Sequence, residues 1–410
     1  MAEAVSSLLM RLVSVERIRR AAQLLEGVVR RTPMEHARDL EKAHGGPVSL
    51  KCENLQRTGS FKIRGAYTRL HALSDEERAR GVVAASAGNH AQGVALAASL
   101  LGIKATVFMP ERAPLPKLAA TKAYGAEVHL HGAVLEEALA EAVAFGERTG
   151  AVFIHPFDHP DIIAGQGTVG LEIVEQLPEV ATVLVSTGGG GLVGGVASAV
   201  KALRPGARLV GVQAEAAAAF PPSLAAGEPV RLANMQTMAD GIAVGRPGPL
   251  TFAHVSELVD DVVTVSEEGL SRAVLNCLER RKLVVEPAGA AAVAALLEHP
   301  GAFEPPVVAV LSGGNVDPLL LLQIIQHGMT AAGRYLYLRL CVPDRPGSLA
   351  GVLTRVSELG ANVIDIEHSR IAGRLAIGEV EIALKLETRG PVHCEEVTQE
   401  LQRAGYTVMP

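Results

Sequence analysis

The sequence predicts an α/β protein with parallel sheets flanked by helices, followed by a smaller domain of a different design. Three observations support this prediction. Short β-branched segments alternate with helical segments from about residue 48 to 330, an order typical of parallel sheets. Several of these strands end in glycine, serine or asparagine, as in folds that bind ligands beyond the carboxyl ends of their strands. From Tyr335 the order changes to βαββαβ, which is typical of a ferredoxin-like domain.

Eight segments of the first part are predicted to be strands because they are short and rich in β-branched residues. They cover residues 48–53, 81–86, 104–110, 126–131, 151–156, 182–187, 208–215 and 307–314. Helices are predicted at residues 13–31, 90–102, 114–125 and 133–150. In the second part the predicted strands are 335–343, 362–370, 378–387 and 406–409, and the predicted helices are 348–360 and 391–405.

Composition narrows the class of protein. The 410 residues, 48% hydrophobic and 20% charged, suffice for two or three domains without disulfides. No two cysteines have a CxxC spacing, so we expect free thiols in a reducing compartment. A net charge of −6 without a clustered basic face argues against nucleic acid, and no apolar run is long enough for a membrane span. Arg11 interrupts the first apolar residues, so we expect no signal peptide and a cytoplasmic protein.

The stretch "ENLQRTGSFKIRGA" places Lys62 between two apolar residues, Phe61 and Ile63. A lysine in this setting is either a surface side chain that reaches toward solvent or a reactive amine held in a pocket. Its immediate neighbours do not decide between the two.

Two glycine-rich turns follow predicted strands and open predicted helices. In "VVAASAGNHAQG" the backbone N–H groups of residues 86–90 could bind an anion such as a carboxylate, although a plain capped helix is the alternative. In "TVLVSTGGGGLVGG" four glycines stand together, more than a plain turn needs, which favours a phosphate close to the backbone. The four are Gly188, Gly189, Gly190 and Gly191.

The glycine run also matches the dinucleotide pattern GxGxxG through Gly189, Gly191 and Gly194, with Glu215 about 20 residues later. An NAD-dependent oxidoreductase is therefore an alternative. That hypothesis leaves Lys62, the "SAGNH" turn and a third turn, "LSGGN" after a predicted strand, without a role.

Four segments, "SFKIRGA", "SAGNHAQG", "STGGGGL" and "LSGGN", resemble in the same order the motifs of the threonine/serine dehydratase family, over about residues 5–325. The tail "VPDRPGSLAGVLTRVSELGANVIDI" resembles an ACT domain, a small amino-acid-binding regulatory module. The resemblance implies a two-lobed fold of type II with bound pyridoxal 5'-phosphate. It implies a catalytic domain at 1–326 with a smaller lobe at roughly 51–150, a linker at 327–334 and an ACT domain at 335–410.

The resemblance also implies a role for individual residues. Lys62 would bind pyridoxal phosphate as a Schiff base and remove the substrate's Cα proton. Phe61 would pack on the cofactor ring, Asn89 would bond to its hydroxyl, Ser312 would face its nitrogen, Glu286 would border it, and Gly188–Gly191 would hold its phosphate. The substrate carboxylate would lie at Ser86, Ala87, Gly88, Asn89 and His90. A buried structural histidine is the alternative for His90.

The expected reaction is threonine ammonia-lyase chemistry, in which water leaves L-threonine or L-serine to give 2-oxobutanoate or pyruvate and ammonia. A serine or 3-hydroxyaspartate dehydratase and a serine racemase are alternatives. Serine racemases resemble the chain but carry a serine where Ala87 stands, so we expect elimination to dominate. The family's divalent-cation site pairs a Glu with an acidic residue six positions later. Because Pro221 follows Glu215 at that distance, we expect no such metal.

The ACT-like tail carries Asp344 in the "DRPGSL" turn before a predicted helix. The resemblance implies an amino-acid effector, such as isoleucine or valine, and a homodimer or homotetramer. A packing module that only drives dimerisation is one alternative. A non-catalytic amino-acid sensor, in which this domain is the whole function, is another.

Overall fold

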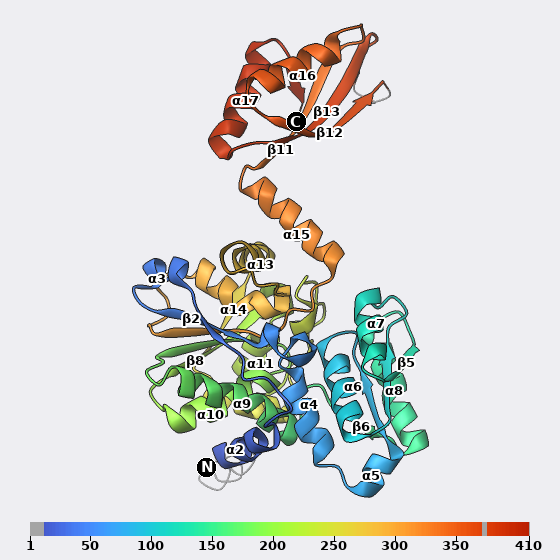
Figure 1. Cartoon of the computed structure of the whole chain (residues 1–410), viewed down its shortest axis with the longest axis vertical. Coiled ribbons are helices and arrows are strands. Elements are labelled where there is room, and N and C mark those ends of the chain that lie inside the picture. Colours follow the sequence, from blue (N-terminus) through green and yellow to red (C-terminus); the bar gives the residue numbers. More distant parts are fainter. Residues whose placement is uncertain (1–11, 371–374, 410) are drawn as a thin grey trace. The chain divides into compact units, whose positions relative to one another are not determined.

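The computed structural model describes residues 12–370 and 375–409, and the chain divides into two compact units. The first unit is Met1–Asp317 and the second is Pro318–Pro410. The first contains two sheets flanked by helices, which confirms the predicted α/β class (Figure 1). Among the described residues, no helix is long and apolar enough to cross a membrane. Arg11, on which the signal-peptide prediction rests, lies outside the described residues.

The larger sheet has the strand order β1-β2-β10-β7-β8-β9. Its strands are Met34–His36, Val48–Cys52, Val307–Leu311, Thr182–Ser186, Arg208–Ala214 and Asp261–Val265 in that order. Within this described sheet, only β1 is antiparallel to its neighbour. The central strands are buried along nearly their whole length, because helices cover both faces of the sheet. The two edge strands, β1 and β9, were not predicted from the sequence.

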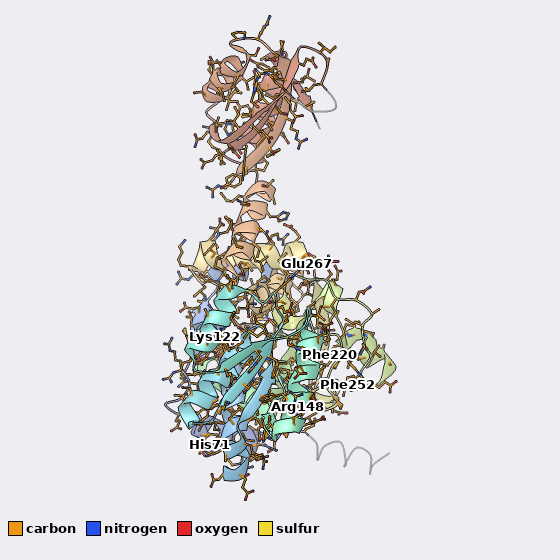
Figure 2. The ribbon with its side chains drawn as sticks, turned by 90° about the vertical axis from the view of Figure 1, so that its right-hand side faces the viewer. His71, Lys122, Arg148, Phe220, Phe252 and Glu267 are labelled. Carbon is orange, nitrogen blue, oxygen red and sulfur yellow. The ribbon has the colours of Figure 1, made fainter. Side chains whose placement is uncertain are left out.

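The smaller sheet, of order β5-β4-β3-β6, is parallel throughout. Its strands are Glu127–Leu130, Ala105–Met109, Val82–Ala85 and Val152–Phe153. The helices α6 (Asn89–Leu101), α7 (Leu115–Ala123) and α8 (Leu135–Thr149) alternate with them. Figure 2 turns this side toward the viewer, with Lys122 of α7 and Arg148 of α8 labelled. We call this sheet with its helices the small lobe and the larger sheet with its helices the large lobe.

Three helices of the first unit pack closely through glycines. They are α4 (Lys62–His71), α9 (Pro160–Gln176) and α10 (Gly191–Leu203). A Cβ on Gly165 of α9 would lie 2.5 Å from the carbonyl oxygen of Arg64 on α4, and one on Gly167 would lie 2.9 Å from that of Gly195 on α10. The backbones of these helices therefore meet only because side chains are absent there.

The remaining elements of the first unit complete the two lobes. They are α2 (Val15–Leu24), α3 (Arg38–His44), α5 (Asp75–Arg80), α11 (Phe220–Ala226), α12 (Pro249–Leu258), α13 (Glu267–Arg281), α14 (Pro287–Glu298) and the short 3-10 turns η1 (Glu53–Leu55), η2 (Arg57–Gly59), η3 (Glu215–Ala217) and η4 (Asp240–Ile242). Helix α2 ends before the predicted limit at residue 31. Gly27, with φ of 73°, takes the left-handed conformation that turns the chain away from the helix.

The second unit begins with α15 (Pro318–Ala331), a helix that extends into residues 327–334. It continues with the order β11 (Tyr335–Pro343), α16 (Ser348–Glu358), β12 (Asn362–Ser369), β13 (Glu379–Glu387), α17 (Pro391–Arg403) and β14 (Thr407–Met409). The sheet is antiparallel with the order β12-β13-β11-β14, and its apolar face packs on the two helices that follow β11 and β13. The βαββαβ prediction is confirmed.

The glycine contact between α4 and α9 predicts that Gly165→Ala destabilises the protein. The added methyl group collides with backbone, which cannot swing aside as a side chain could, and overpacking of this kind costs about 1–3 kcal/mol. Gly206→Ala is the matched control, because a Cβ there meets no atom within 4 Å, and we expect a change below about 0.5 kcal/mol. Urea unfolding of both variants measures the difference. Equal stabilities would contradict the close packing.

Candidate active site

The side chain of Lys62 turns into the protein rather than toward solvent. Lys62 is the first residue of α4, and its Nζ donates a hydrogen bond of 2.9 Å to the carbonyl oxygen of Pro156. The same nitrogen lies 5.2 Å from the centre of the Phe61 ring. The structure thus favours a held amine over a snorkelling surface lysine.

The surroundings of Lys62 disfavour its charged form. Burial lowers the pKa of the Lys62 amine to about 8, and the carboxylate of Glu286 only partly opposes this shift. The hydrogen-bond partner of the amine is a neutral carbonyl, not an acid. An amine of this kind has a substantial neutral fraction at pH 8, and the neutral amine is the form that attacks carbonyl carbon or removes a proton.

The turn after β10 fixes the chain that leads into Lys62. The N–H of Phe61 donates to the carbonyl of Ser312 (3.2 Å), and Ser60 pairs with Gly313 in an isolated antiparallel bridge. The side chain of Asn315 donates to the carbonyl of Thr58 (2.7 Å), whose φ of 62° is unusual for a residue with a side chain. These contacts bring the "SFKIRGA" and "LSGGN" motifs together.

Asn89 and Glu286 join the same network from two further elements. Asn315 Nδ2 donates to Asn89 Oδ1 (2.7 Å), and Asn89 Nδ2 donates to Glu286 Oε1 (2.5 Å). Asn315 ends the "LSGGN" motif, but the sequence analysis assigned it no role. Its position at the end of a glycine turn was the signal, but its partners lie more than 200 residues away in the chain.

Glu286 is a buried carboxyl at the start of α14. Burial raises its pKa to about 7, and the nearby Asp240 carboxylate adds to the rise. Lys117, the hydrogen bond from Asn89, and Lys62 act in the opposite direction. Two groups beside the same turn, Lys62 and Glu286, therefore have pKa values shifted toward neutrality.

The turn at Ser86–Asn89 leads into helix α6, whose N-terminus is uncapped among the described residues and accessible. Gly88 precedes α6, and no side chain of the described residues caps this helix. The Ser86 hydroxyl accepts a 3.1 Å hydrogen bond from the N–H of Gly88. A Cβ on Gly88 would meet no described atom within 4 Å, so there is room beside the helix start. Such an N-terminus suits an anion.

His90 lies on the first turn of α6 but points into the protein. Its ring is buried and its Nε2 donates to the carbonyl of Ile154 (2.9 Å). Burial lowers the pKa of His90 to about 3, helped by the charge of Lys62, so the ring is neutral. These contacts support the structural alternative that the sequence left open.

The glycine run connects β7 to α10, and close packing accounts for each of its glycines. A Cβ on Gly189 or Gly191 would collide with Phe157, and one on Gly188 would lie 2.9 Å from Cα of Ile242. Gly190 has φ of 93°, and its Cβ would meet Thr251 at 2.9 Å. The number of glycines therefore does not by itself favour a phosphate, because protein atoms alone exclude side chains here.

Two features at the glycine run nevertheless point to a ligand. No side chain of the described residues caps the start of α10, so its first N–H groups are available to an anion. The Ser186 hydroxyl at the end of β7 is buried and has no partner in the described part of the chain. The segment 156–157, which the sequence did not single out, touches both this run and Lys62.

Comparison with known proteins identifies the family of this architecture. Residues 25–313 match the model described as pyridoxal-phosphate dependent enzyme, and residues 336–405 match the ACT domain. The chain belongs to the pyridoxal-phosphate dependent enzyme family. It is a lyase that uses pyridoxal phosphate, and it carries an ACT domain. The match does not support the dinucleotide hypothesis for the glycine run.

Several relatives of this pyridoxal-phosphate dependent enzyme cover most of the chain. The L-threonine ammonia-lyase of Thermotoga maritima is 48% identical over 97% of this chain and 99% of its own. The L-threonine ammonia-lyase of Geobacter sulfurreducens is 47% identical over 95% of this chain and 98% of its own. The structure of maize serine racemase is 38% identical, covers 78% of this chain and 98% of its own, and has a TM-score of 0.73.

The residues of this pyridoxal-phosphate dependent enzyme fit its cofactor. The aldehyde needs a neutral amine, which Lys62 provides, and an aromatic side chain, Phe61, adjoins that amine. The phosphate needs N–H and hydroxyl donors, which the uncapped start of α10 and the unpartnered Ser186 hydroxyl in the described part of the chain provide. Ser312 is buried directly after β10 and would offer a neutral hydroxyl to the ring nitrogen of a bound cofactor.

A buried ion network lies beneath this site, and the sequence analysis missed it. Arg64, two residues after Lys62, donates from two nitrogens to Glu53 (both 2.8 Å) and from one of its terminal nitrogens to Glu172 (2.7 Å). Lys51 donates to the other oxygen of Glu172 (2.5 Å). Several charged residues within the short stretch "SLKCENLQRTGSFKIRGA" were the available signal.

Glu215, the residue considered for a metal site, lies exposed on η3. Among residues 12–370 and 375–409 no group of three or more His, Cys, Asp or Glu side chains could hold a metal ion. The cysteines are free, with Cys52 and Cys277 buried.

The lowered pKa of Lys62 predicts the pH dependence of aldehyde capture by the cofactor-free protein. Only the neutral amine reacts, so the rate of capture by Lys62 should rise with pH and reach half its maximum at about pH 8. The corresponding midpoint for an ordinary lysine is about pH 10.4. Borohydride reduction at each pH followed by peptide mass spectrometry measures modification at Lys62, and the exposed Lys104 serves as the internal control. A midpoint at Lys62 as high as that of an ordinary lysine would contradict the desolvated pocket.

Proposed function

We propose that this protein is a threonine ammonia-lyase, which removes water from L-threonine to give 2-oxobutanoate and ammonia and acts on L-serine in the same way to give pyruvate. The observation that carries the proposal is the Lys62 amine, desolvated and held at the meeting point of four motifs. The names of the two relatives that match nearly the whole chain support the choice of substrate.

Each part of the site has a task in this proposal. Bound pyridoxal phosphate supplies the electron sink for the charge left on Cα when its proton is removed. Phe61 would pack beside the ring, Asn89 would donate toward its hydroxyl, and Ser312 would offer a neutral hydroxyl to its nitrogen. The start of α10 after Gly188–Gly191 would hold the phosphate through N–H groups. Glu286, which is hydrogen-bonded to Asn89, would border the ring.

The substrate is oriented at the start of α6. The backbone N–H groups at Ser86–Asn89 bind its carboxylate, where the helix dipole favours a negative charge. This contact directs the Cα–H bond toward Nζ of Lys62, which takes the proton as general base. The β-hydroxyl then leaves with a proton as water, and hydrolysis of the resulting enamine yields the 2-oxo acid and ammonia.

Ala87 favours elimination over racemisation. Racemisation requires a second group that returns a proton to the opposite face of Cα, and the methyl group of Ala87 cannot carry one. The likeness to maize serine racemase keeps racemase activity as a second candidate. Assays of L-threonine, L-serine and 3-hydroxyaspartate for 2-oxo acid, with D-serine measured in parallel, separate the candidates. Predominant D-serine formation would contradict elimination.

We further propose that the bounds are 1–326 for the catalytic domain, 327–334 for a linker and 335–410 for a regulatory domain. The ACT match supports an amino-acid effector such as isoleucine or valine. Asp344, in the turn before α16, is held by two hydrogen bonds from Arg370 (2.9 and 3.1 Å). We also propose a cytoplasmic homodimer or homotetramer; the free cysteines support the reducing compartment. Light scattering with and without each amino acid measures the assembly.

The proposed role of Lys62 predicts that Lys62→Ala lowers kcat/KM for L-threonine by about 10²- to 10⁴-fold, because the general base is removed. Borohydride should no longer attach the cofactor to the protein. Lys104→Ala is the control, because Lys104 is exposed on the small lobe, and it should behave as the wild type. Full activity in Lys62→Ala would contradict the proposal, and unchanged amino-acid binding without any wild-type turnover would favour a sensor.

A further inference from the structure

One ion pair joins the small lobe to the large lobe beside the active site. Nζ of Lys117, on α7, lies 2.6 Å from Oδ2 of Asp240, at the start of η4. The two side chains differ in exposure, 10% for Lys117 and 63% for Asp240. An ammonium that is almost buried needs a partner, and Asp240 provides one.

The turn η4 forms part of the wall of the site. Cα of Ile242 lies 2.9 Å from the position that a Cβ on Gly188 would occupy, so η4 packs directly against the glycine run. A Cβ on Gly241 would lie 3.0 Å from that of Ala288 and 3.8 Å from Oε1 of Glu286. A displacement of η4 would therefore alter both the phosphate end and the Glu286 end of the site.

We propose that Lys117 and Asp240 are positioning residues that act as a latch between the lobes. Their ion pair holds α7 against η4 while substrate is bound, and its opening admits substrate and releases product. The inference rests on the proposed lyase function for its effect on kinetics. Its structural part, the fastening of η4, is independent of the reaction.

The uneven exposure of the pair suits a contact that opens and closes. Asp240 is already largely hydrated, so its carboxylate loses little when it separates from Lys117. The Lys117 ammonium is nearly buried, so the pair opens only together with a movement of α7 away from η4 that exposes this ammonium to water. The Arg64–Glu53 pair is the contrast, since both side chains are at most 1% exposed and its separation would leave two buried charges. The protein thus has a permanent ion network under Lys62 and a reversible ion pair at η4.

The pair also acts electrostatically on Glu286. The groups that face this carboxyl are Asp240, which raises its pKa, and Lys117 and Lys62, which lower it together with the hydrogen bond from Asn89. Removing the charge of Lys117 should therefore raise the pKa of Glu286, and removing that of Asp240 should lower it. A purely structural contact would shift both variants in the same direction.

The test compares Lys117→Met, Asp240→Asn and the double variant in the cofactor-loaded enzyme. The control is Lys104→Met, which breaks an exposed pair with Glu127 (3.1 Å) in the same lobe. We expect kcat/KM for L-threonine to fall about three- to fivefold in each single variant and no further in the double variant, because one shared contact is lost. The pH profiles of the two single variants should move in opposite directions.

Hydrogen exchange provides a readout that needs no turnover. The N–H groups of Ile242, Ala243 and Val244 donate hydrogen bonds within and just after η4, so their exchange reports its opening. We expect faster exchange over residues 240–244 in both single variants and no change in the control. Unchanged hydrogen exchange over residues 240–244, or losses in kcat/KM that add up in the double variant, would overturn the latch proposal. A wild type that releases no 2-oxobutanoate would refute the lyase proposal, while the exchange result still decides the latch.

Discussion

The site depends on the ion pairs that the buried Arg64 guanidinium forms. Arg64 lies two residues after Lys62 and binds both Glu53 and Glu172, while Lys51 completes the charge balance. Arg64, Glu53 and Lys51 are essentially inaccessible to solvent. Removing one partner of such a network leaves an uncompensated charge and costs about 3–5 kcal/mol. The start of α4, and with it the Lys62 amine, is therefore fixed by charges from β2, η1 and α9.

Glycine serves two purposes in this chain, and the sequence does not separate them. Gly165 and Gly167 allow α9 to approach α4 and α10, and the run at Gly188–Gly191 makes room for Phe157 and Ile242. Gly88 is different, because space remains beside it at the start of α6. An open glycine at an uncapped helix start is thus a better sign of a ligand than a crowded run of four.

The sequence was sufficient for features that depend on local pattern. Burial makes a central strand such as β10 apolar throughout, so the predicted strands of the α/β body and the βαββαβ tail were found. The edge strands β1 and β9 are both partly exposed. Strand β1 contains no β-branched residue, whereas β9, with the sequence DVVTV, carries the pattern and was overlooked. The family motifs also brought Lys62, Asn89 and Glu286 into one neighbourhood, which agrees with their contacts.

Other features of the site could not be predicted from local pattern. Glu172 lies 108 residues from Arg64, Asn89 lies 226 residues from Asn315, and Asp240 lies 123 residues from Lys117. Such pairs form only when the fold brings distant segments together. The most direct test of the central claim is therefore a change at Arg64 that keeps its charge but removes its geometry.

That measurement is cofactor capture by Arg64→Lys. Lysine cannot reproduce the planar fork that binds Glu53 and Glu172 together, so α4 should loosen. We expect a folded protein with a lower Tm and a reduced fraction of Lys62 that borohydride attaches to pyridoxal phosphate. Arg281→Lys, which alters a well-buried arginine paired with Asp39, should lower only the Tm. Undiminished capture by Lys62 in a destabilised Arg64→Lys protein would contradict the claim that this network positions the amine.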